Sequence, residues 1–303
     1  MASLPKILVI GSCNTDMVVR AERLPAPGET ILGGTFIMNP GGKGANQAIA
    51  ASRLGAEVTF ISKIGYDLFG LQALEIYRSE KINTDYIFTH QGPSGVALIS
   101  VDSDGENSII VAPGANYTMT KSEIDKADDQ FRSADLVLLQ LEIPLEIAEY
   151  AAEKAAGYGK RVILNPAPAP EKLSDEFLKN IFCILPNATE ARRLTGIEII
   201  DFNSALKATE NLCARGVGNA VITLGKRGAF VKERDKHDLI PAKKAETIDT
   251  TGAGDVFCGA FCVYLAEGHS VTESVEFANA AAATAVTRVG AQSSIPYRQD
   301  ITL

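Results

Sequence analysis

Short apolar runs alternate with helix-like segments along most of the chain, and this alternation constrains the fold more than any other feature. The patterns at 6–11, 58–61, 136–139, 162–164, 182–185 and 220–224 are typical of buried strands. Helical patterns lie between them at 44–54, 68–79, 144–156, 188–195 and 204–215. Strands separated by helices pair in parallel, so the sequence predicts a doubly wound α/β domain with a mostly parallel sheet flanked by helices. We expect ligands at the carboxyl ends of its strands.

Two segments, 16–38 and 85–112, interrupt the alternation. The first contains a Pro-Ala-Pro-Gly turn at 25–28 between extended patterns, and the second contains apolar runs at 96–101 and 108–111 around an Asp-Gly turn. We expect a small antiparallel sheet that covers the pocket as a lid and whose apolar face pairs two chains as a homodimer. The alternative is a plain extension of the main sheet. No repeat or linker divides the chain, so we predict one domain, 1–303, with this lid subdomain.

Composition excludes several classes of protein. The chain has 303 residues, of which 46% are hydrophobic and 22% charged, which is ordinary for a globular domain. A net charge of −8 argues against a nucleic-acid partner, whose phosphates the average surface repels. The five cysteines show no zinc-like spacing, and no run resembles a signal peptide or a membrane span. We therefore expect a cytoplasmic protein with reduced thiols and no membrane association.

A glycine-rich turn at 249–255, Asp-Thr-Thr-Gly-Ala-Gly-Asp, precedes the apolar pattern of a helix. Gly252 and Gly254 let backbone N–H groups approach an anion at the helix N-terminus. The helix dipole stabilises the Asp255 carboxylate, which could accept a proton from a hydroxyl group. This is equipment for phosphoryl transfer to an alcohol. The same residues also fit a plain loop with Thr251 as N-cap, but they match neither a Walker loop nor a dinucleotide fingerprint.

Four further segments strengthen the first of these interpretations. They are Gly-Ser-Cys-Asn-Thr-Asp at 11–16, Gly-Gly-Lys-Gly-Ala-Asn-Gln-Ala at 41–48, Asn-Pro-Ala-Pro-Ala at 165–169 and Pro-Asn-Ala-Thr-Glu at 186–190. Read with the turn at 249–255, the chain resembles the ribokinase-like (pfkB-type) carbohydrate kinases from end to end. The resemblance implies ATP-dependent phosphorylation of D-ribose at its 5-hydroxyl, which yields ribose 5-phosphate and ADP. Alternatives are a fructokinase, an adenosine kinase or a catalytically silent sugar-binding regulator. An oxidoreductase would need a dinucleotide fingerprint after the first strand, which 11–14 does not supply.

The resemblance also implies site residues. Asp255 is the expected general base, and the amides of Gly252, Ala253 and Gly254 are the expected anion hole. The expected sugar-binding residues, besides Asp255, are Asn14, Asp16, Gly42, Lys43, Asn46 and Glu142. Their amides and carboxylates suit sugar hydroxyls, although Asn14 and Asp16 could be plain turn residues. The family's use of Asp16 for vicinal hydroxyls favours a pentose that retains its 2-hydroxyl.

The remaining implied residues bind nucleotide and cations. Asn187 and Glu190 are expected near the phosphates and Mg²⁺, a role compatible with an N-cap and its first-turn acid. Thr223, Gly225, Gly228 and Gly254 are expected to border ATP, and Asn279 its adenine. A K⁺ site is implied at Asp249, Thr251, Ala285, Arg288, Gly290 and Ser294, largely through backbone oxygens. We expect little of a final helix before Leu303, and a missing helix would leave the segment near the K⁺ site weakly anchored.

Overall fold

One large sheet forms the centre of the protein. The computed structural model describes residues 3–104 and 106–302, and within them nine strands follow the order β13-β12-β11-β10-β9-β8-β1-β4-β5. Neighbouring strands from β11 to β5 pair in parallel. At the other edge, β12 pairs antiparallel with β11 and β13 pairs antiparallel with β12. The predicted mostly parallel sheet is confirmed. The strands are β1 (Lys6–Ile10), β4 (Glu57–Gly65), β5 (Ile87–His90), β8 (Leu136–Leu139), β9 (Arg161–Leu164), β10 (Cys183–Ile184), β11 (Asn219–Thr223), β12 (Ala229–Glu233) and β13 (Lys236–Ile240).

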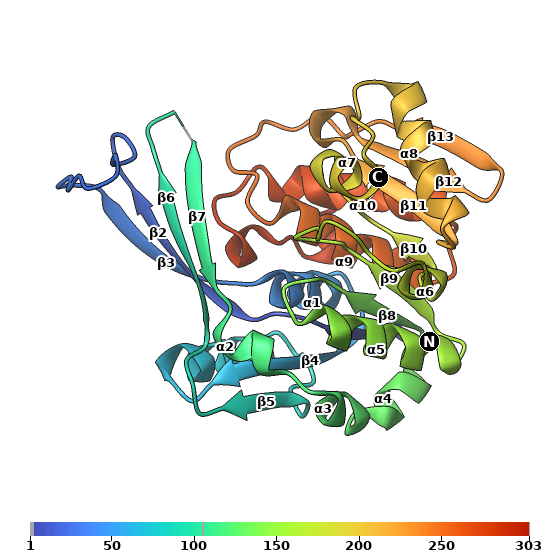
Figure 1. Ribbon diagram of the computed structural model, residues 1–303, viewed down its shortest axis with the longest axis horizontal. Helices are drawn as coiled ribbons and strands as arrows, with labels where there is room; N and C mark the ends of the chain where they lie inside the picture. Colours follow the sequence, from blue (N-terminus) through green and yellow to red (C-terminus); the bar gives the residue numbers. More distant parts are fainter. Residues whose placement is uncertain (1–2, 105, 303) are drawn as a thin grey trace.

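Helices cover both faces of this sheet (Figure 1). Ile7 and Val9 of β1 join the core formed with α1, α9 and α10, whereas Leu8 and Ile10 join the core formed with α4 and α5. Successive strand residues point to opposite faces, so β1 is buried on both sides, as a doubly wound fold requires. The helices are α1 (Lys43–Arg53), α2 (Leu68–Ser79), α3 (Lys121–Asp125), α4 (Asp128–Ser133), α5 (Leu145–Gly157), α6 (Asp175–Lys179), α7 (Ala188–Thr195), α8 (Phe202–Ala214), α9 (Ala253–Ala266) and α10 (Val271–Ala285).

The five predicted helices appear as α1, α2, α5, α7 and α8, with bounds within two residues of those expected. The short helices α3, α4 and α6 and the strands β5, β12 and β13 were not predicted. Short 3₁₀ turns complete the described elements: η1 (Gly114–Thr118), η2 (Gly225–Arg227), η3 (Gln292–Ser294) and η4 (Arg298–Asp300). After η3, the described chain ends with the single turn η4, which agrees with the expectation of little final helix. No helix in 3–104 or 106–302 is long and apolar enough to cross a membrane.

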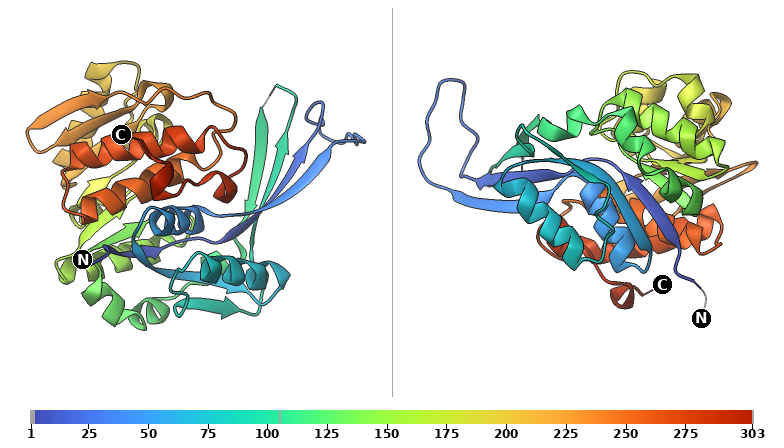
Figure 2. Two further views of the ribbon diagram at one scale, coloured as in Figure 1. Left: turned by 180° about the vertical axis from the view of Figure 1, so that it is seen from behind. Right: turned by 90° about the horizontal axis from the view of Figure 1, so that it is seen from below.

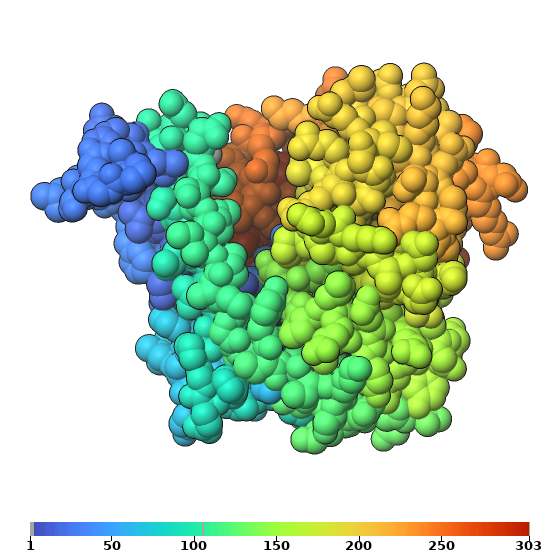
Figure 3. Space-filling model, in the orientation of Figure 1, coloured from blue at the N-terminus to red at the C-terminus, as the bar shows by residue number. Residues whose placement is uncertain are grey.

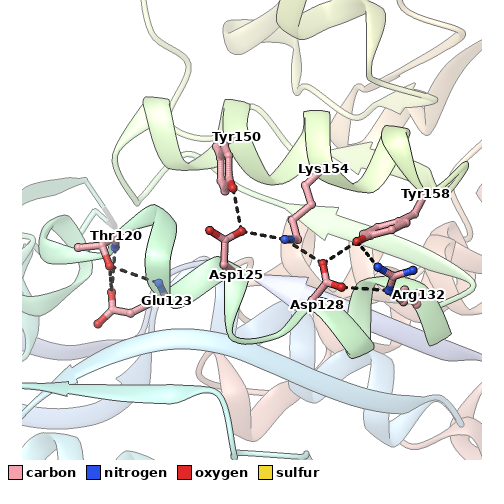
Figure 4. Close-up of polar contacts among 8 residues, drawn as sticks. All are labelled: Thr120, Glu123, Asp125, Asp128, Arg132, Tyr150, Lys154 and Tyr158. Atoms are coloured by element: carbon pink, nitrogen blue, oxygen red, sulfur yellow. Dashed lines mark hydrogen bonds and ion pairs between the residues drawn. The ribbon is translucent and has the colours of Figure 1, made fainter.

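Polar contacts fasten α3 and α4 to α5 (Figure 4). Lys154 of α5 lies between two carboxylates, 2.8 Å from Asp125 and 2.9 Å from Asp128. Tyr150 and Tyr158 donate hydrogen bonds to the same carboxylates at 2.7 and 2.6 Å. Helices of five or six residues are too short to be stable alone, so this contact with α5 holds them in place.

The remaining strands form the lid: four strands of the described chain make a separate sheet in the order β3-β2-β6-β7. They are β2 (Asn14–Arg20), β3 (Thr35–Gly41), β6 (Gly95–Val101) and β7 (Asn107–Ala112). Figure 2 shows this sheet projecting from the body as a plate. The predicted separate sheet is confirmed, and the alternative of an extended main sheet is wrong for these strands.

Three details of the lid prediction need correction. The sheet is mixed rather than antiparallel, because β2 and β6 pair in parallel. The chain between them passes through β3, α1, β4, α2 and β5, which is the long crossover that parallel pairing needs. Within the inserted segment 85–112, β5 pairs with β4 of the main sheet, so the lid part begins at Gly95. Within the segment 16–38, residues 29–34 form no strand, and β3 runs on to Gly41.

Candidate active site

The predicted site residues gather at the carboxyl ends of the strands, beside the lid. Figure 3 shows the surface hollowed between the lid and the part of the body built by α7 and α8. The chain enters this region after β1, where residues 11–13 lead directly into β2. The N-termini of α1 and α9 reach the same place, and Glu142 follows β8. This is where ligands bind in open α/β sheets.

Glu142 joins several of the residues that were expected to bind the sugar. One of its carboxylate oxygens accepts hydrogen bonds from the Ser12 hydroxyl at 2.6 Å and from the Lys43 backbone N–H at 3.0 Å. The Asn14 amide lies 3.5 Å from the same oxygen. A carboxylate at the N-terminus of α1 is stabilised by the helix dipole. The structure therefore brings Asn14, Lys43 and Glu142 together as predicted, and it adds Ser12.

Glycines at 41 and 42 allow the strand and the helix to meet. Gly42 has φ of +90°, and a Cβ there would lie 2.6 Å from the Asn14 nitrogen. A Cβ on Gly41 would overlap the Asp16 carboxylate, which lies against it. Larger residues would push the Asn14 and Asp16 side chains out of position.

Charged residues around Glu142 shift one another's pKa values. Burial raises the pKa of the Asp16 carboxyl to about 6, and the negative charges of Glu142 and Asp255 add to the rise. Burial alone would lower the pKa of the Lys43 ammonium, yet that pKa is raised. The cause is the neighbouring carboxylates of Asp255, Glu142 and Glu190. Lys43 is thus held as a cation among carboxylates, and the raised pKa makes the Asp16 carboxyl easier to protonate than an ordinary aspartate.

The sequence analysis missed Asn116, in η1, which fixes Asn14. The Asn116 amide accepts from the Cys13 N–H at 2.9 Å and donates to the Cys13 carbonyl at 3.1 Å. It also donates to Asn14 Oδ1 at 2.8 Å. Because that oxygen is occupied, the Asn14 amide group points its N–H donors toward Glu142 and the pocket.

Asp255 lies in the first turn of α9 and is 7% exposed. Its two oxygens accept hydrogen bonds from the Asn46 amide at 2.9 Å and the Gln47 amide at 3.0 Å. Asn46 Oδ1 is buried and finds no partner in the described chain, so it is a free acceptor beside Asp255. The predicted proximity of Asn46 and Asp255 is present, and Gln47 was not predicted.

The turn before α9 presents backbone amides next to this carboxylate. Gly252 is the N-cap, with φ of +74°. The Ala253 N–H already donates to the Thr250 carbonyl at 3.2 Å. Within residues 3–104 and 106–302, the Gly252 and Gly254 N–H groups have no such partner, and a Cβ on Gly254 would meet nothing within 4 Å. Gly252 and Gly254 therefore fit an anion hole better than Ala253 does.

The nucleotide-side residues lie along the ends of β10 to β13. Asn187 caps α7 in a reciprocal capping box with Glu190, whose distances are 2.8 and 2.9 Å. Thr223, at the end of β11, bridges to Asn187, and Gly225 and Gly228 form the turn into β12. Burial raises the pKa of Glu190, although bonds from Asn187 and the charge of Lys43 oppose the rise. The N-cap expected for Asn187 is therefore present.

Asn279 of α10 is buried rather than solvated. Its amide donates to the carbonyls of Ile240 and Pro241 at 3.3 and 3.2 Å. It therefore fixes the backbone where β13 ends, and any contact with adenine would be made by this loop and Asn279 together.

The residues of the implied K⁺ site come from two segments, 249–251 and 285–294, and the Asp249 N–H donates to the Val286 carbonyl of the second segment at 3.2 Å. Asp249 accepts hydrogen bonds from the Thr251 N–H and the Gly290 N–H, each at 2.9 Å. Burial alone would raise the pKa of Asp249, but these bonds and one from the Thr251 hydroxyl lower it. The Arg288 guanidinium pairs with Asp300 at 3.1 Å, so Arg288 could offer a cation only its carbonyl. The carbonyl of Ala285 accepts from Arg288, and the Ser294 hydroxyl donates to Ala291.

Comparison with known proteins gives one consistent result. The family model described as pfkB family carbohydrate kinase matches residues 4–298. The chain is 45% identical to a ribokinase of Haemophilus influenzae, covering 97% of this chain and 96% of that protein. It is 36% identical to a deoxyribokinase of Salmonella typhi, covering 96% and 95%. Among solved structures, ribokinase of Arabidopsis thaliana complexed with ribose and ATP is 35% identical, with a TM-score of 0.90 and coverage of 98% and 97%.

Proposed function

The chain belongs to the pfkB family of carbohydrate kinases, and we propose that it transfers the γ-phosphoryl group of ATP to the 5-hydroxyl of D-ribose. One observation carries the proposal: the Asp255 carboxylate is held by two amides beside the free N–H groups of Gly252 and Gly254. A base and an anion hole next to a pocket for hydroxyls are what phosphoryl transfer to a sugar needs. The solved relative that binds ribose and ATP supports the choice of substrates.

In this proposal Asp255 accepts the proton of the attacking hydroxyl. The free amides and the N-terminus of α9 stabilise the charge on the transferring group. The transition state is loose, so positioning and electrostatics contribute most of the rate, and proton removal contributes roughly 10²–10⁴-fold. Closure of the lid would exclude water from the phosphoryl donor.

Asn14, Asp16 and Glu142 are proposed to bind the sugar hydroxyls, together with Lys43 and Asn46. The donors and acceptors are complementary: Asn14 presents N–H groups, whereas Asn46 Oδ1 and the carboxylates present acceptors. A vicinal diol that bridges two such groups needs its 2-hydroxyl. Because a relative is a deoxyribokinase, the second candidate substrate is 2-deoxyribose.

The residues also fit the expected cations. Glu190 and Asn187 offer the hard oxygen ligands that Mg²⁺ prefers while it keeps most of its waters, and Mg²⁺ would neutralise phosphate charge. At the second site Asp249 is the only carboxylate among the implied residues, and the others would offer mainly backbone oxygens. That low charge suits a monovalent ion such as K⁺, which would stabilise the loop before α9.

A homodimer through the lid is the proposed assembly. In the lid register Met38, Met17, Leu98 and Ile110 lie side by side on one face, opposite to the face of Asp16. Met38, Leu98 and Ile110 are 44%, 51% and 69% exposed, and Phe36 on the same face is 61% exposed. A contiguous apolar face of this kind marks a protein contact.

The test is ADP release with ATP, Mg²⁺ and K⁺ across ribose, 2-deoxyribose, fructose and adenosine. We expect the highest kcat/KM with ribose, and a loss of about 10²–10⁴-fold in kcat in Asp255→Ala with the fold intact by circular dichroism. Preference for another acceptor would keep the mechanism and change the substrate. Near-normal turnover in Asp255→Ala would refute the assignment of the base, and sugar binding without turnover would favour the silent regulator.

A further inference from the structure

We propose that Gln47 is a positioning residue that orients the Asp255 carboxylate and favours its ionised form. The inference rests on the proposed role of Asp255 as general base. Gln47, in the first half of α1, is fully buried. Its amide nitrogen lies 3.0 Å from Asp255 Oδ1 and also 3.0 Å from Asn165 Oδ1, so both of its N–H groups have acceptors.

The direction of these bonds is fixed by groups that can only accept. The Leu185 carbonyl accepts from the Asn165 amide nitrogen at 2.9 Å, so Asn165 must turn its oxygen toward Gln47. The Asp255 carboxylate likewise requires a donor. Both requirements assign the nitrogen of Gln47 to this side, and its oxygen then faces Gln140.

Gln140 completes the arrangement from the other side. Its amide nitrogen donates to Gln47 Oε1 at 2.6 Å, and Gln140 itself is fully buried just after β8. The residue fits because Gly11 has no side chain: a Cβ there would overlap the Gln140 amide. Gln47 is therefore held on both ends by residues from the ends of β8 and β9, which are rigid parts of the main sheet.

A neutral donor has a particular use here. Hydrogen bonds to an ionised carboxylate favour its charged form, but they add no charge to a crowded site. Asn46, the other side-chain donor to Asp255, is expected to contact the sugar, whereas Gln47 lies behind the carboxylate. The charged or titratable groups that also act on Asp255 or share its surroundings are Asp16 on β2, Lys43 on α1, Glu142 after β8, Glu190 on α7 and Cys258 on α9.

Two near-isosteric variants test the inference through the pH dependence of kcat. Gln47→Met removes both donors, and we expect kcat to fall about tenfold and its acid limb to move up by about one pH unit. Gln47→Glu sets a second carboxyl against Asp255, so the pair keeps a proton to higher pH and the limb should move further. Asn219→Leu is the matched control, since Asn219 is a buried amide that donates to the Phe182 carbonyl at the opposite end of the sheet.

We expect Asn219→Leu to lower the melting temperature without moving the acid limb. An unchanged limb in both Gln47 variants, with kcat falling only as far as the folded fraction falls, would overturn the inference. If neither Gln47 variant folds, Gln140→Met takes their place, because it frees the Gln47 amide to rotate. We then expect a smaller shift of the acid limb in the same direction, and an unmoved limb would contradict the inference. Asp255→Asn separates the two hypotheses, because activity retained there would refute the base itself.

Discussion

Strand β8 in the body reads Leu-Val-Leu-Leu, and strand β7 in the lid reads Asn-Ser-Ile-Ile-Val-Ala, yet all four residues of β8 are buried and all six of β7 are exposed. Apolar residues in the body are buried by other parts of the same chain and stabilise the fold. Those of β7 are left exposed by the monomer. The exposed apolar residues of β7 are consistent with the proposed contact between two lids, and the stability of the monomer alone does not account for them.

The largest change in the free energy of unfolding is expected for a substitution in the core of the body rather than in the lid. Phe261 of α9 is fully buried in the core beside α1 and α10. Phe261→Ala leaves a cavity there and should lower the free energy of unfolding by about 3–5 kcal/mol. Urea denaturation followed by circular dichroism measures this loss. A cost below about 1 kcal/mol would mean that the body is no better packed than the lid.

A smaller effect of opposite sign is expected where the lid joins the body, at Asp16 on β2. The pKa of Asp16 is about 6 in the folded protein and lower in the unfolded chain, so the unfolded state releases this proton first as pH rises. Stability is therefore lost between about pH 4 and pH 6. Asp16→Asn removes this cost and should stabilise the protein at pH 7.5 by up to about 2 kcal/mol.

The same substitution should abolish turnover with ribose, because the amide cannot replace an ionised acceptor of two hydroxyls. Melting temperatures at pH 4.5 and pH 7.5 provide the control, since the gain in stability should shrink at the lower pH. A variant less stable than the wild type at pH 7.5 would show that Asp16 contributes to folding in the way a body residue does.

The smallest change in monomer stability is expected in the lid. Ile110→Ser replaces a side chain that is 69% exposed and should alter the free energy of unfolding of the monomer by less than about 0.5 kcal/mol. It should nevertheless weaken the proposed dimer, which sedimentation over a range of concentrations would detect. Ser108→Ala, also on exposed β7, serves as the control. If Ile110→Ser associates as strongly as the wild type, the outer face of the lid is not the dimer contact.

The sequence allowed the body to be predicted better than the lid, for physical reasons. Buried parallel strands and amphipathic helices leave strong periodic patterns, so β1 and α1 were found close to their observed positions. The parallel pairing of β2 with β6 joins strands that are separated in sequence by β3, α1, β4, α2 and β5, and no local pattern records such a contact. Strand β5 lies in a segment that was assigned to the lid, and only its pairing with β4 shows otherwise.

The site was predicted unevenly in the same way. Motif residues such as Asn46 and Asp255 were found through the resemblance and do meet in the structure. Gln47 stood in a quoted motif, but its role depends on Gln140 and Asn165, which are distant in sequence. A lone Gln after the apolar run 136–139 was the available signal, since a buried amide needs partners.

The root of β2 has a further consequence. Asn14 and Asp16 both lie on β2 of the lid sheet, but only Asn14 is also hydrogen-bonded to Asn116 of η1, which packs against β4 of the main sheet. In the proposed closure of the lid, Asn14 would stay with the body while Asp16 moves with the lid, so the affinity of the proposed sugar site would depend on the position of the lid. By thermodynamic reciprocity, a second chain that favours one lid position must change sugar affinity by the same factor by which the sugar changes association of the two chains.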